Sequence, residues 1–355
     1  MNDRLTKVLD EYKRLGIAEQ IDYDKFYLYS LITHSTAIEG STVTEIENQL
    51  LLDEGITAKG RTMQEQMMNL DLKRAYEHSI RLAKEHTPFS VEMLRGLSAI
   101  VMKNTGSSYN TVLGSFDASQ GDLRLVNVSA GFGGSSYMDF HKVPAALEGF
   151  CQWLNERRRV VGKDVVAQYN LSFDAHLRLV TIHPWVDGNV VQGESRENLF
   201  TMLSQSNDSE ANGRMSRLVM NHLQFEYGLV PVRVNKENRA EYIAALVASR
   251  EAESPEPFRR FMLNEHIANL EREMAEYTRQ TGGQKIAEVD RKGGQKTREV
   301  LLQMIADDPT VTTTQMASAL GINRSAVSKH LDRLKADGRL RRVGPEKGGH
   351  WELLM

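Results

Sequence analysis

The chain has 355 residues, 41% of them hydrophobic and 26% charged, which is ordinary for a globular protein and enough for two or three domains. No apolar run approaches the roughly 20 residues of a membrane-spanning helix, and the charged N-terminus is unlike a secretory signal, so we expect no membrane partner. The single cysteine, Cys151, excludes a disulfide framework and a cysteine-rich metal site, and it leads us to expect a reducing, cytoplasmic location.

The net charge of −3 hides an asymmetry along the chain. Residues 291–355 carry 12 Lys+Arg against 7 Asp+Glu, a net charge of +5, which leaves −8 on the residues before them. A basic C-terminal segment favours a nucleic-acid partner, although charge alone specifies little.

Helical patterns dominate residues 1–280, so we expect a mainly α fold, with residues 1–110 as a helical N-terminal region. In this region Ser35 and Glu39 are spaced to share one helical face, and Gly40 fits a helix C-cap. A carboxylate at the C-terminal end of a helix opposes the helix dipole. The position of Glu39 at this helix end therefore indicates a role other than stabilising the helix.

Two further elements are expected before the most informative part of the chain. Residues 121–142 predict a short β-hairpin, because Leu123, Leu125 and Val128 alternate with polar residues ahead of a glycine-rich turn. Residues 164–182 predict a helix, since apolar side chains recur every three or four positions. His183 follows this helix, and Pro184 discourages its continuation.

Two separated segments hold the residues best suited to catalysis: HPWVDGN, from His183 to Asn189, and NGRMSR, from Asn212 to Arg217. Nucleotidyl transfer to a hydroxyl needs a base, a cation for the phosphates and donors for the developing negative charge. His183 suits the base, and Asp187 offers the hard oxygen that Mg²⁺ prefers. The remaining residues are suited to binding phosphate. Glycine and asparagine allow tight turns whose N–H groups can point at a phosphate, and a helix beginning near Met215 adds its positive end. The arginines can make charge-assisted hydrogen bonds to phosphate oxygens. These residues are Gly188, Asn189, Asn212, Gly213, Arg214 and Arg217.

Joined end to end, the segments read HPWVDGNGRMSR, which resembles the H-P-F-x-[DE]-G-N-G-R-x-x-R motif of the Fic family. This family typically transfers AMP from ATP to hydroxyl groups of proteins. The resemblance covers roughly residues 30–265 and implies a Fic-type helical core with a small β-hairpin flap, which in the family pairs with an extended segment of the target. It also implies ATP and Mg²⁺ at the site and a target protein with a Ser, Thr or Tyr hydroxyl.

An insertion separates the two halves of the motif, either 189–211 or 190–212, because Asn189 and Asn212 can each supply the motif asparagine. A structureless loop of this length is uncommon, and its closure costs on the order of 3 kcal/mol. The insertion either bulges out and leaves the site intact or displaces the phosphate-binding turn and weakens catalysis. We favour the bulge, because the catalytic residues survive on both sides.

The hexapeptide from Ser35 to Gly40, STAIEG, matches the [ST]-x-x-x-E-[GN] inhibitory motif of the same family. The resemblance implies that Glu39 pairs with Arg217 and keeps the γ-phosphate of ATP from its productive position. The alternative is a solvated glutamate beside a capping glycine.

The C-terminal part predicts a Gly- and Lys-rich linker, about residues 271–295, and then a compact unit of three helices and a hairpin, residues 296–355. The run T-x-x-x-x-A-x-x-L-G-I-N-R-S-A-V-S-K-H-L resembles the winged helix-turn-helix of MarR-like regulators. Its third helix would enter a major groove and its wing would contact phosphates. The residues concerned are Asn323, Arg324, Ser325, Ser328, Lys329, Arg341 and Arg342. We therefore expect double-stranded DNA as a partner, while docking to protein and homodimer formation stay open.

The leading interpretation is an autoinhibited protein adenylyltransferase with an appended DNA-binding module, its catalytic core at residues 111–270. The alternative is a catalytically weak or inert Fic-like transcriptional regulator. Transfer of a group other than AMP is a third hypothesis.

Overall fold

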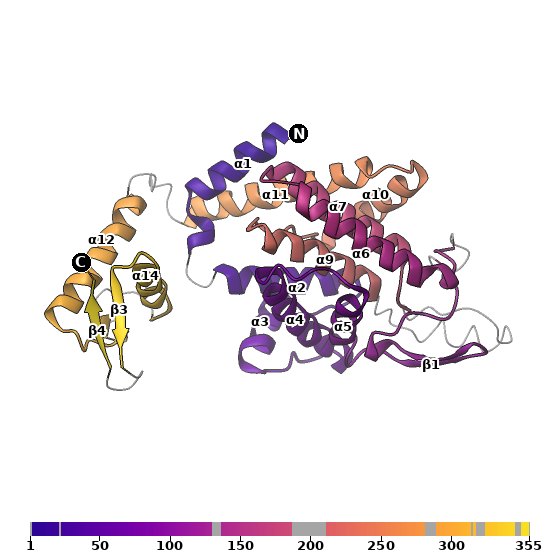
Figure 1. Cartoon of the computed structure of the whole chain (residues 1–355), viewed down its shortest axis with the longest axis horizontal. Coiled ribbons are helices and arrows are strands. Elements are labelled where there is room, and N and C mark those ends of the chain that lie inside the picture. The colour runs from indigo at the N-terminus through magenta and orange to yellow at the C-terminus, as the bar shows by residue number, and fades with distance from the viewer. Residues whose placement is uncertain are drawn as a thin grey trace. The chain divides into compact units, whose positions relative to one another are not determined.

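The computed structural model of the chain describes residues 2–20, 23–129, 136–186, 211–280, 289–313, 315–316, 324–344 and 349–354, and Figure 1 shows their elements. The side chains of residues 280, 289–297 and 324–326 lie outside this description. The described part is mainly helical, which confirms the predicted fold class, and its strands form two sheets of two strands each. None of the described helices combines the length and the apolarity that a bilayer crossing demands.

Three of the N-terminal helices begin at side chains that accept hydrogen bonds from the first backbone N–H groups of the helix. Thr44 and Thr62 each form a capping box with the glutamate three positions later, and Ser90 accepts from the N–H of Met93. The elements of this part are α1 (Asn2–Arg14), a 3-10 turn (Ile17–Glu19), α2 (Tyr23–Ile38), α3 (Glu45–Glu54), α4 (Met63–Lys84) and α5 (Val91–Val101).

Five further α-helices among the described residues position the candidate site. They are α6 (Val143–Val160), α7 (Val165–Ile182), α9 (Ala211–Glu226), α10 (Arg239–Glu251) and α11 (Glu256–Gln280). The helix predicted at 164–182 is confirmed as α7, and Asp164 caps it by accepting from the N–H of Ala167 at 2.8 Å. In the core, α9 packs against both α7 and α4, while α6 packs on α7. Buried aromatic and aliphatic side chains such as Phe173, Leu179 and Leu218 fill the space between them.

The start of α9 differs from the expectation of a helix near Met215. The helix begins at Ala211, so Asn212 and Gly213 belong to its first turn rather than to a loop before it. Their backbone N–H groups are thus among those that a helix leaves without an internal acceptor.

The β-hairpin of regular strands lies upstream of the predicted one. Strands β1 (Ser108–Thr111) and β2 (Gly114–Asp117) pair antiparallel, and their turn, Val112 and Leu113, lacks the Gly or Asn signal on which the prediction relied. Within 121–142 the described residues hold no regular strand, only an isolated antiparallel bridge between Ser129 and Ser136 and a 3-10 turn (Phe140–Lys142). The backbone N–H of Tyr137 also donates to the Val128 carbonyl at 3.0 Å, so the chain does double back there.

The C-terminal elements are α12 (Val289–Asp307), α14 (Arg324–Ala336), β3 (Leu340–Val343) and β4 (His350–Leu353). Buried apolar residues from all four, among them Leu301, Leu331, Leu340 and Trp351, form one cluster. The second of the three helices predicted within 296–355 falls at about 314–321, and most of these residues lie outside the description.

The chain separates into two compact units, residues 1–6 with 26–269 and residues 7–25 with 270–355. Residues 26–110 of the predicted N-terminal region share a unit with α7 and α9, while residues 7–25 fall in the other unit. Within the predicted linker at 271–295 the described residues are helical, since α11 extends to Gln280 and α12 begins at Val289. The Gly-rich composition that suggested a linker did not prevent helix formation on either side of 281–288.

Candidate nucleotide and base site

The side chain of Asn212 joins the two halves of the motif. Its Oδ1 accepts from the backbone N–H of Trp185 at 3.1 Å, and its Nδ2 donates to the Trp185 carbonyl at 2.9 Å. Both residues are buried. The segment after α7 therefore lies against the first turn of α9, although the two residues are 27 positions apart in the sequence.

His183, the predicted base, ends α7 with a left-handed backbone at φ 54° and ψ 62°. This conformation costs a residue other than glycine roughly 1–2 kcal/mol, and it turns the chain sharply out of the helix. The Nδ1 atom lies 3.4 Å from the carbonyl of Val180, so a proton on Nδ1 can be donated there and Nε2 is left as the acceptor. The side chain is buried, at 5% exposed, which limits access of water to the base.

The imidazole of His183 is covered by a stack that the sequence did not indicate. The ring of Tyr137 lies parallel to it, with centroids 3.7 Å apart and 15° between the planes. The guanidinium of Arg250 lies 5.0 Å from the centroid of Tyr137. A cation near the face of an electron-rich ring is attractive, so the stack helps to fix the orientation of the imidazole.

Arg124 ties this region together and was also missed. Its Nε donates to the carbonyl of His183 at 2.7 Å, its Nη1 donates to the carbonyl of Val126 at 2.7 Å, and its own N–H donates to the carbonyl of Pro184 at 3.1 Å. Arg124 is buried, at 1% exposed, although its alternation with two leucines predicts a solvent-facing side chain. The signal was absent because a charged residue in such a pattern normally faces water.

A buried ion pair connects the predicted inhibitory residue to the second motif arginine. Nη2 of Arg217 contacts Oε1 of Glu39 and donates to the carbonyl of Ser35 at 3.0 Å, while Nε donates to Ser35 Oγ at 2.8 Å. Burial opposes the charged form of Arg217, but the neighbouring Glu39 carboxylate outweighs it and raises the pKa of the guanidinium above its ordinary value. Glu39 follows the last residue of α2, and Gly40 has φ 94°, as the predicted C-cap requires.

The Glu39 carboxylate also lies against Gly213. A Cβ added at Gly213 would overlap Oε1 of Glu39 and would lie 3.1 Å from Nη1 of Arg217. Gly213 is in the first turn of α9, where free N–H groups and the helix dipole favour an anion. The carboxylate therefore stands at a place that suits a phosphate.

Arg214, the first motif arginine, points elsewhere among the described contacts. Its Nη1 donates to the carbonyl of Val101 at 3.3 Å, and its Nη2 lies 3.0 Å from the sulfur of Met102. Both partners lie at the C-terminal end of α5, where carbonyl groups favour a cation. Its predicted phosphate contact stays a prediction.

Asp187, Gly188 and Asn189 lie outside the described residues, as does the insertion up to residue 210. Within the described part of the chain, no three His, Cys, Asp or Glu side chains gather as metal ligands. The predicted Mg²⁺ site at Asp187 is therefore not tested.

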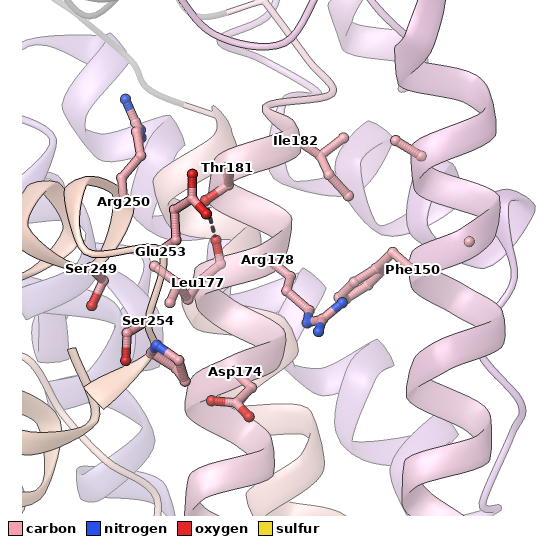
Figure 2. Close-up of a pocket in the computed structure, with 13 residues that line it drawn as sticks. Phe150, Asp174, Leu177, Arg178, Thr181, Ile182, Ser249, Arg250, Glu253 and Ser254 are labelled. Atoms are coloured by element: carbon pink, nitrogen blue, oxygen red, sulfur yellow. Dashed lines mark hydrogen bonds between the residues drawn. The ribbon is translucent and has the colours of Figure 1, made fainter. Parts of the chain in front are cut away.

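A cavity of about 480 Å³ lies beside the end of α7, and Figure 2 shows its lining. Ile182, the residue before the base, and Arg250, the outer member of the stack, both border it. Arg178 extends from α7 toward Phe150 on α6, and its guanidinium lies 4.0 Å from the centroid of the Trp153 ring. His183 itself is not among the lining residues, which on α7 extend from Asp174 to Ile182.

The predicted DNA-contact residues are only partly described. Asn323 and the side chains of Arg324 and Ser325 are outside the description, while Ser328 and Lys329 are exposed on α14. In the wing, Arg341 is paired with Glu352, and Arg342 lies 4.6 Å from the centroid of the Trp351 ring. To contact DNA, Arg341 would have to leave the carboxylate of Glu352 and bind a phosphate instead.

Comparison with family models identifies both parts of the chain. Residues 88–192 match the Fic/DOC family, and residues 295–341 match a winged helix-turn-helix DNA-binding family. The chain therefore carries a Fic/DOC domain followed by a winged helix-turn-helix domain. The first match ends inside the insertion, before the second half of the motif.

Curated relatives are named protein adenylyltransferases. The chain is 24% identical to protein adenylyltransferase fic-1 of Caenorhabditis elegans over 252 residues, which are 70% of this chain and 41% of the relative. It is 26% identical to protein adenylyltransferase Fic of Drosophila melanogaster over 240 residues, which are 65% of this chain and 39% of the relative. The chain thus spans about two fifths of the length of these relatives.

Solved structures show the same fold. Fic-1 from Caenorhabditis elegans aligns with a TM-score of 0.53 and 22% identity, over 77% of this chain and 70% of that one. A Fic family protein from Desulfovibrio desulfuricans aligns with a TM-score of 0.55 and 15% identity, over 99% of this chain and 96% of that one.

Proposed function

We propose that the chain transfers AMP from ATP to a hydroxyl of a target protein, and that Glu39 holds this activity in an inhibited state. The observation that carries the proposal is the Glu39 carboxylate, placed between Gly213 and Arg217 where the motif calls for a phosphate. The relatives named adenylyltransferases support AMP as the transferred group.

The chemistry assigns one step to each group of residues. Nε2 of His183 takes the proton from the target hydroxyl, whose oxygen then bonds to the α-phosphorus of ATP while the bond to the β-phosphate breaks and pyrophosphate leaves. Tyr137 and Val180 hold the imidazole for this transfer. Arg217 and the N–H groups in the first turn of α9 stabilise the charge on the phosphates.

Mg²⁺ would neutralise phosphate charge in such a reaction. Asp187 is the residue that the sequence offers as its ligand, together with oxygens of the nucleotide. This assignment remains a prediction from the sequence.

One feature of the contact between Glu39 and Arg217 favours release from the inhibited state. Oε2 of Glu39 is buried and finds no hydrogen-bond partner among the described residues. A buried charged oxygen without a partner costs free energy, so the inhibited arrangement is less stable than a fully bonded one. Withdrawal of Glu39 into water would recover that cost.

The test is incubation with α-labelled ATP and Mg²⁺, followed by measurement of label on the protein itself and on added proteins. We expect weak labelling of the wild type and at least tenfold more with Glu39→Gly. Adding His183→Ala to Glu39→Gly should abolish it. A folded Glu39→Gly protein that binds ATP but transfers nothing would support the alternative, a regulator whose Fic domain has no catalytic role.

The second part of the proposal is that the winged helix-turn-helix domain binds double-stranded DNA. The family match at 295–341 and the exposed Ser328 and Lys329 on α14 support it. A DNA-binding module also fits the regulator alternative, so it does not decide between the two functions.

A further inference from the structure

Arg217 is held from two sides by different parts of the fold. On one side Ser35 and Glu39, both at the C-terminal end of α2, bind Nε and Nη2. On the other side the hydroxyl of Tyr242, from α10, lies 3.4 Å from Nη1. The Tyr242 ring centroid is 5.9 Å from Cζ of the same guanidinium.

The Tyr242 hydroxyl has its own fixed partner in the core. It lies 2.8 Å from Nε2 of His176, on α7. Because Nη1 of Arg217 can only donate, the hydroxyl accepts from it and donates its own proton to Nε2. His176 can accept because burial, with a smaller contribution from Arg217, lowers its pKa well below the ordinary value and keeps it neutral.

Packing fixes this Tyr–His pair. His176 stacks on Phe258, with ring centroids 4.9 Å apart, and Tyr242 packs on the same phenylalanine. His176 and Phe258 are fully buried, and Tyr242 is 2% exposed. Tyr242 and His176 therefore belong to the packed core and not to the end of α2 that precedes Glu39.

We propose that Tyr242, oriented by His176, is a positioning residue that keeps Arg217 at the phosphate site when Glu39 withdraws. Ser35 and Glu39 belong to the same helix end, so a movement of that end removes both contacts together. The bond from Tyr242 then remains and prevents the long arginine side chain from sampling other rotamers. This inference rests on the proposed function only for the identity of the ligand.

The experiment compares the Tyr242→Phe substitution in full-length wild type and in full-length Glu39→Gly. Mg-ATP affinity and the steady-state constants for AMP transfer are measured in each. In the Glu39→Gly background, loss of the hydroxyl should weaken Mg-ATP binding about three- to tenfold, the range of one hydrogen bond to a charged group. The loss should fall mainly on KM for ATP, and it should be smaller when Glu39 is present, because Glu39 then holds Arg217 in addition to Ser35.

Tyr169→Phe is the matched control. The Tyr169 hydroxyl is also paired with a buried histidine, lying 3.0 Å from Nε2 of His266, and it donates to the carbonyl of Val230 at 2.9 Å, while none of the described hydrogen bonds joins it to Arg217. Both substitutions remove a hydroxyl–imidazole bond and should lower stability similarly. Only Tyr242→Phe should change nucleotide affinity, and an equal effect from Tyr169→Phe would reduce Tyr242 to a purely structural role.

A crystal structure of each variant without nucleotide separates this inference from the proposed function. With Glu39→Gly, Arg217 should stay within hydrogen-bond distance of Tyr242. With Glu39→Gly and Tyr242→Phe together, Ser35 is the remaining described partner of the guanidinium, and Nη1 should move from the place that it has in the first variant. If Arg217 leaves Tyr242 in the first variant, or keeps its place in the second, the inference is wrong. Failure of Glu39→Gly to bind Mg-ATP would contradict the proposed function, while these structures would still decide the role of Tyr242.

Discussion

At the level of single residues, the proposed inhibition depends on the carboxylate of Glu39. It is paired with Arg217 in a nearly dry environment, with 1% of the Glu39 side chain and 4% of the Arg217 side chain exposed. Removing one member of such a pair leaves the other charge uncompensated, which costs about 3–5 kcal/mol in typical cases. Here Ser35 and Tyr242 would still bind Arg217, so we expect Glu39→Gly to cost less than this and to remain folded.

Gly213→Ala tests the contact between the carboxylate and α9. The new Cβ would overlap Glu39 Oε1, so the ion pair with Arg217 must shift. We expect a loss of about 1–3 kcal/mol in the free energy of unfolding, the usual cost of overpacking. Urea unfolding measures it.

The same change should cost less in the Glu39→Gly background, where Nη1 of Arg217, 3.1 Å from the added Cβ, is the near neighbour that remains and can shift with its flexible side chain. Gly149→Ala, on α6 with no atom within 4 Å of the added Cβ, is the control and should be neutral or slightly stabilising. Equal losses from Gly213→Ala in both backgrounds would show that the carboxylate is not in contact with Gly213.

At the level of elements, the core helices carry three histidines that burial keeps neutral. Burial lowers the pKa of His222, on α9, and of His266, on α11, to about 3, and the pKa of His176, on α7, is also lowered. In the unfolded chain these groups take up protons below about pH 6.5. Because the folded protein binds fewer protons than the unfolded chain, the contribution of these groups to the free energy of unfolding is fully present above about pH 6.5 and is lost as the pH falls below it.

The expected slope is on the order of 1.4 kcal/mol per pH unit for each of the three histidines between pH 6 and 4. Urea unfolding at several pH values measures it. A free energy of unfolding that stays constant from pH 7 to 5 would contradict the neutral, buried state of these residues.

The insertion between α7 and α9 gives a second prediction at this level. Deleting residues 189–211 restores HPWVDGNGRMSR and keeps the asparagine that bonds to Trp185. If the insertion bulges out of the site, Glu39→Gly with the deletion should transfer AMP within about tenfold of Glu39→Gly alone, as labelled ATP would show. A second variant replaces residues 190–210 with a Gly–Ser run of the same length. If this variant is active while the folded deletion protein is inactive, the hypothesis that the insertion bulges out of the site is wrong.

The winged domain gives a third prediction. Lys329→Glu, on the exposed face of α14, should weaken binding to a short DNA duplex about three- to tenfold, because it replaces a cation near the phosphates with an anion. Fluorescence anisotropy measures the affinity, which should also fall between 50 and 200 mM salt. Lys236→Glu, an exposed site in the other unit with the same change of charge, should have little effect, and equal effects would exclude α14 as the DNA-binding helix.

For the whole molecule, sequence patterns predicted what is local and missed what depends on distant contacts. The period of α7 and the glycine after Glu39 define two helix ends, so His183 and Glu39 could be placed in advance. The β1–β2 hairpin was missed because its two turn residues, Val112 and Leu113, carry no turn signal, and Gly114 with φ 129° comes only after them. Arg124 and Tyr242 were missed because their partners, 59 and 66 positions away, cannot be inferred from neighbouring residues.

The most direct test is a crystal structure of Glu39→Gly with Mg²⁺ and a non-hydrolysable ATP analogue. We predict that a terminal phosphate takes the place of the Glu39 carboxylate, against Gly213 and Arg217, with the α-phosphate facing His183. An analogue bound elsewhere, while that place stays closed to it, would contradict the claim that Glu39 substitutes for a phosphate of the nucleotide.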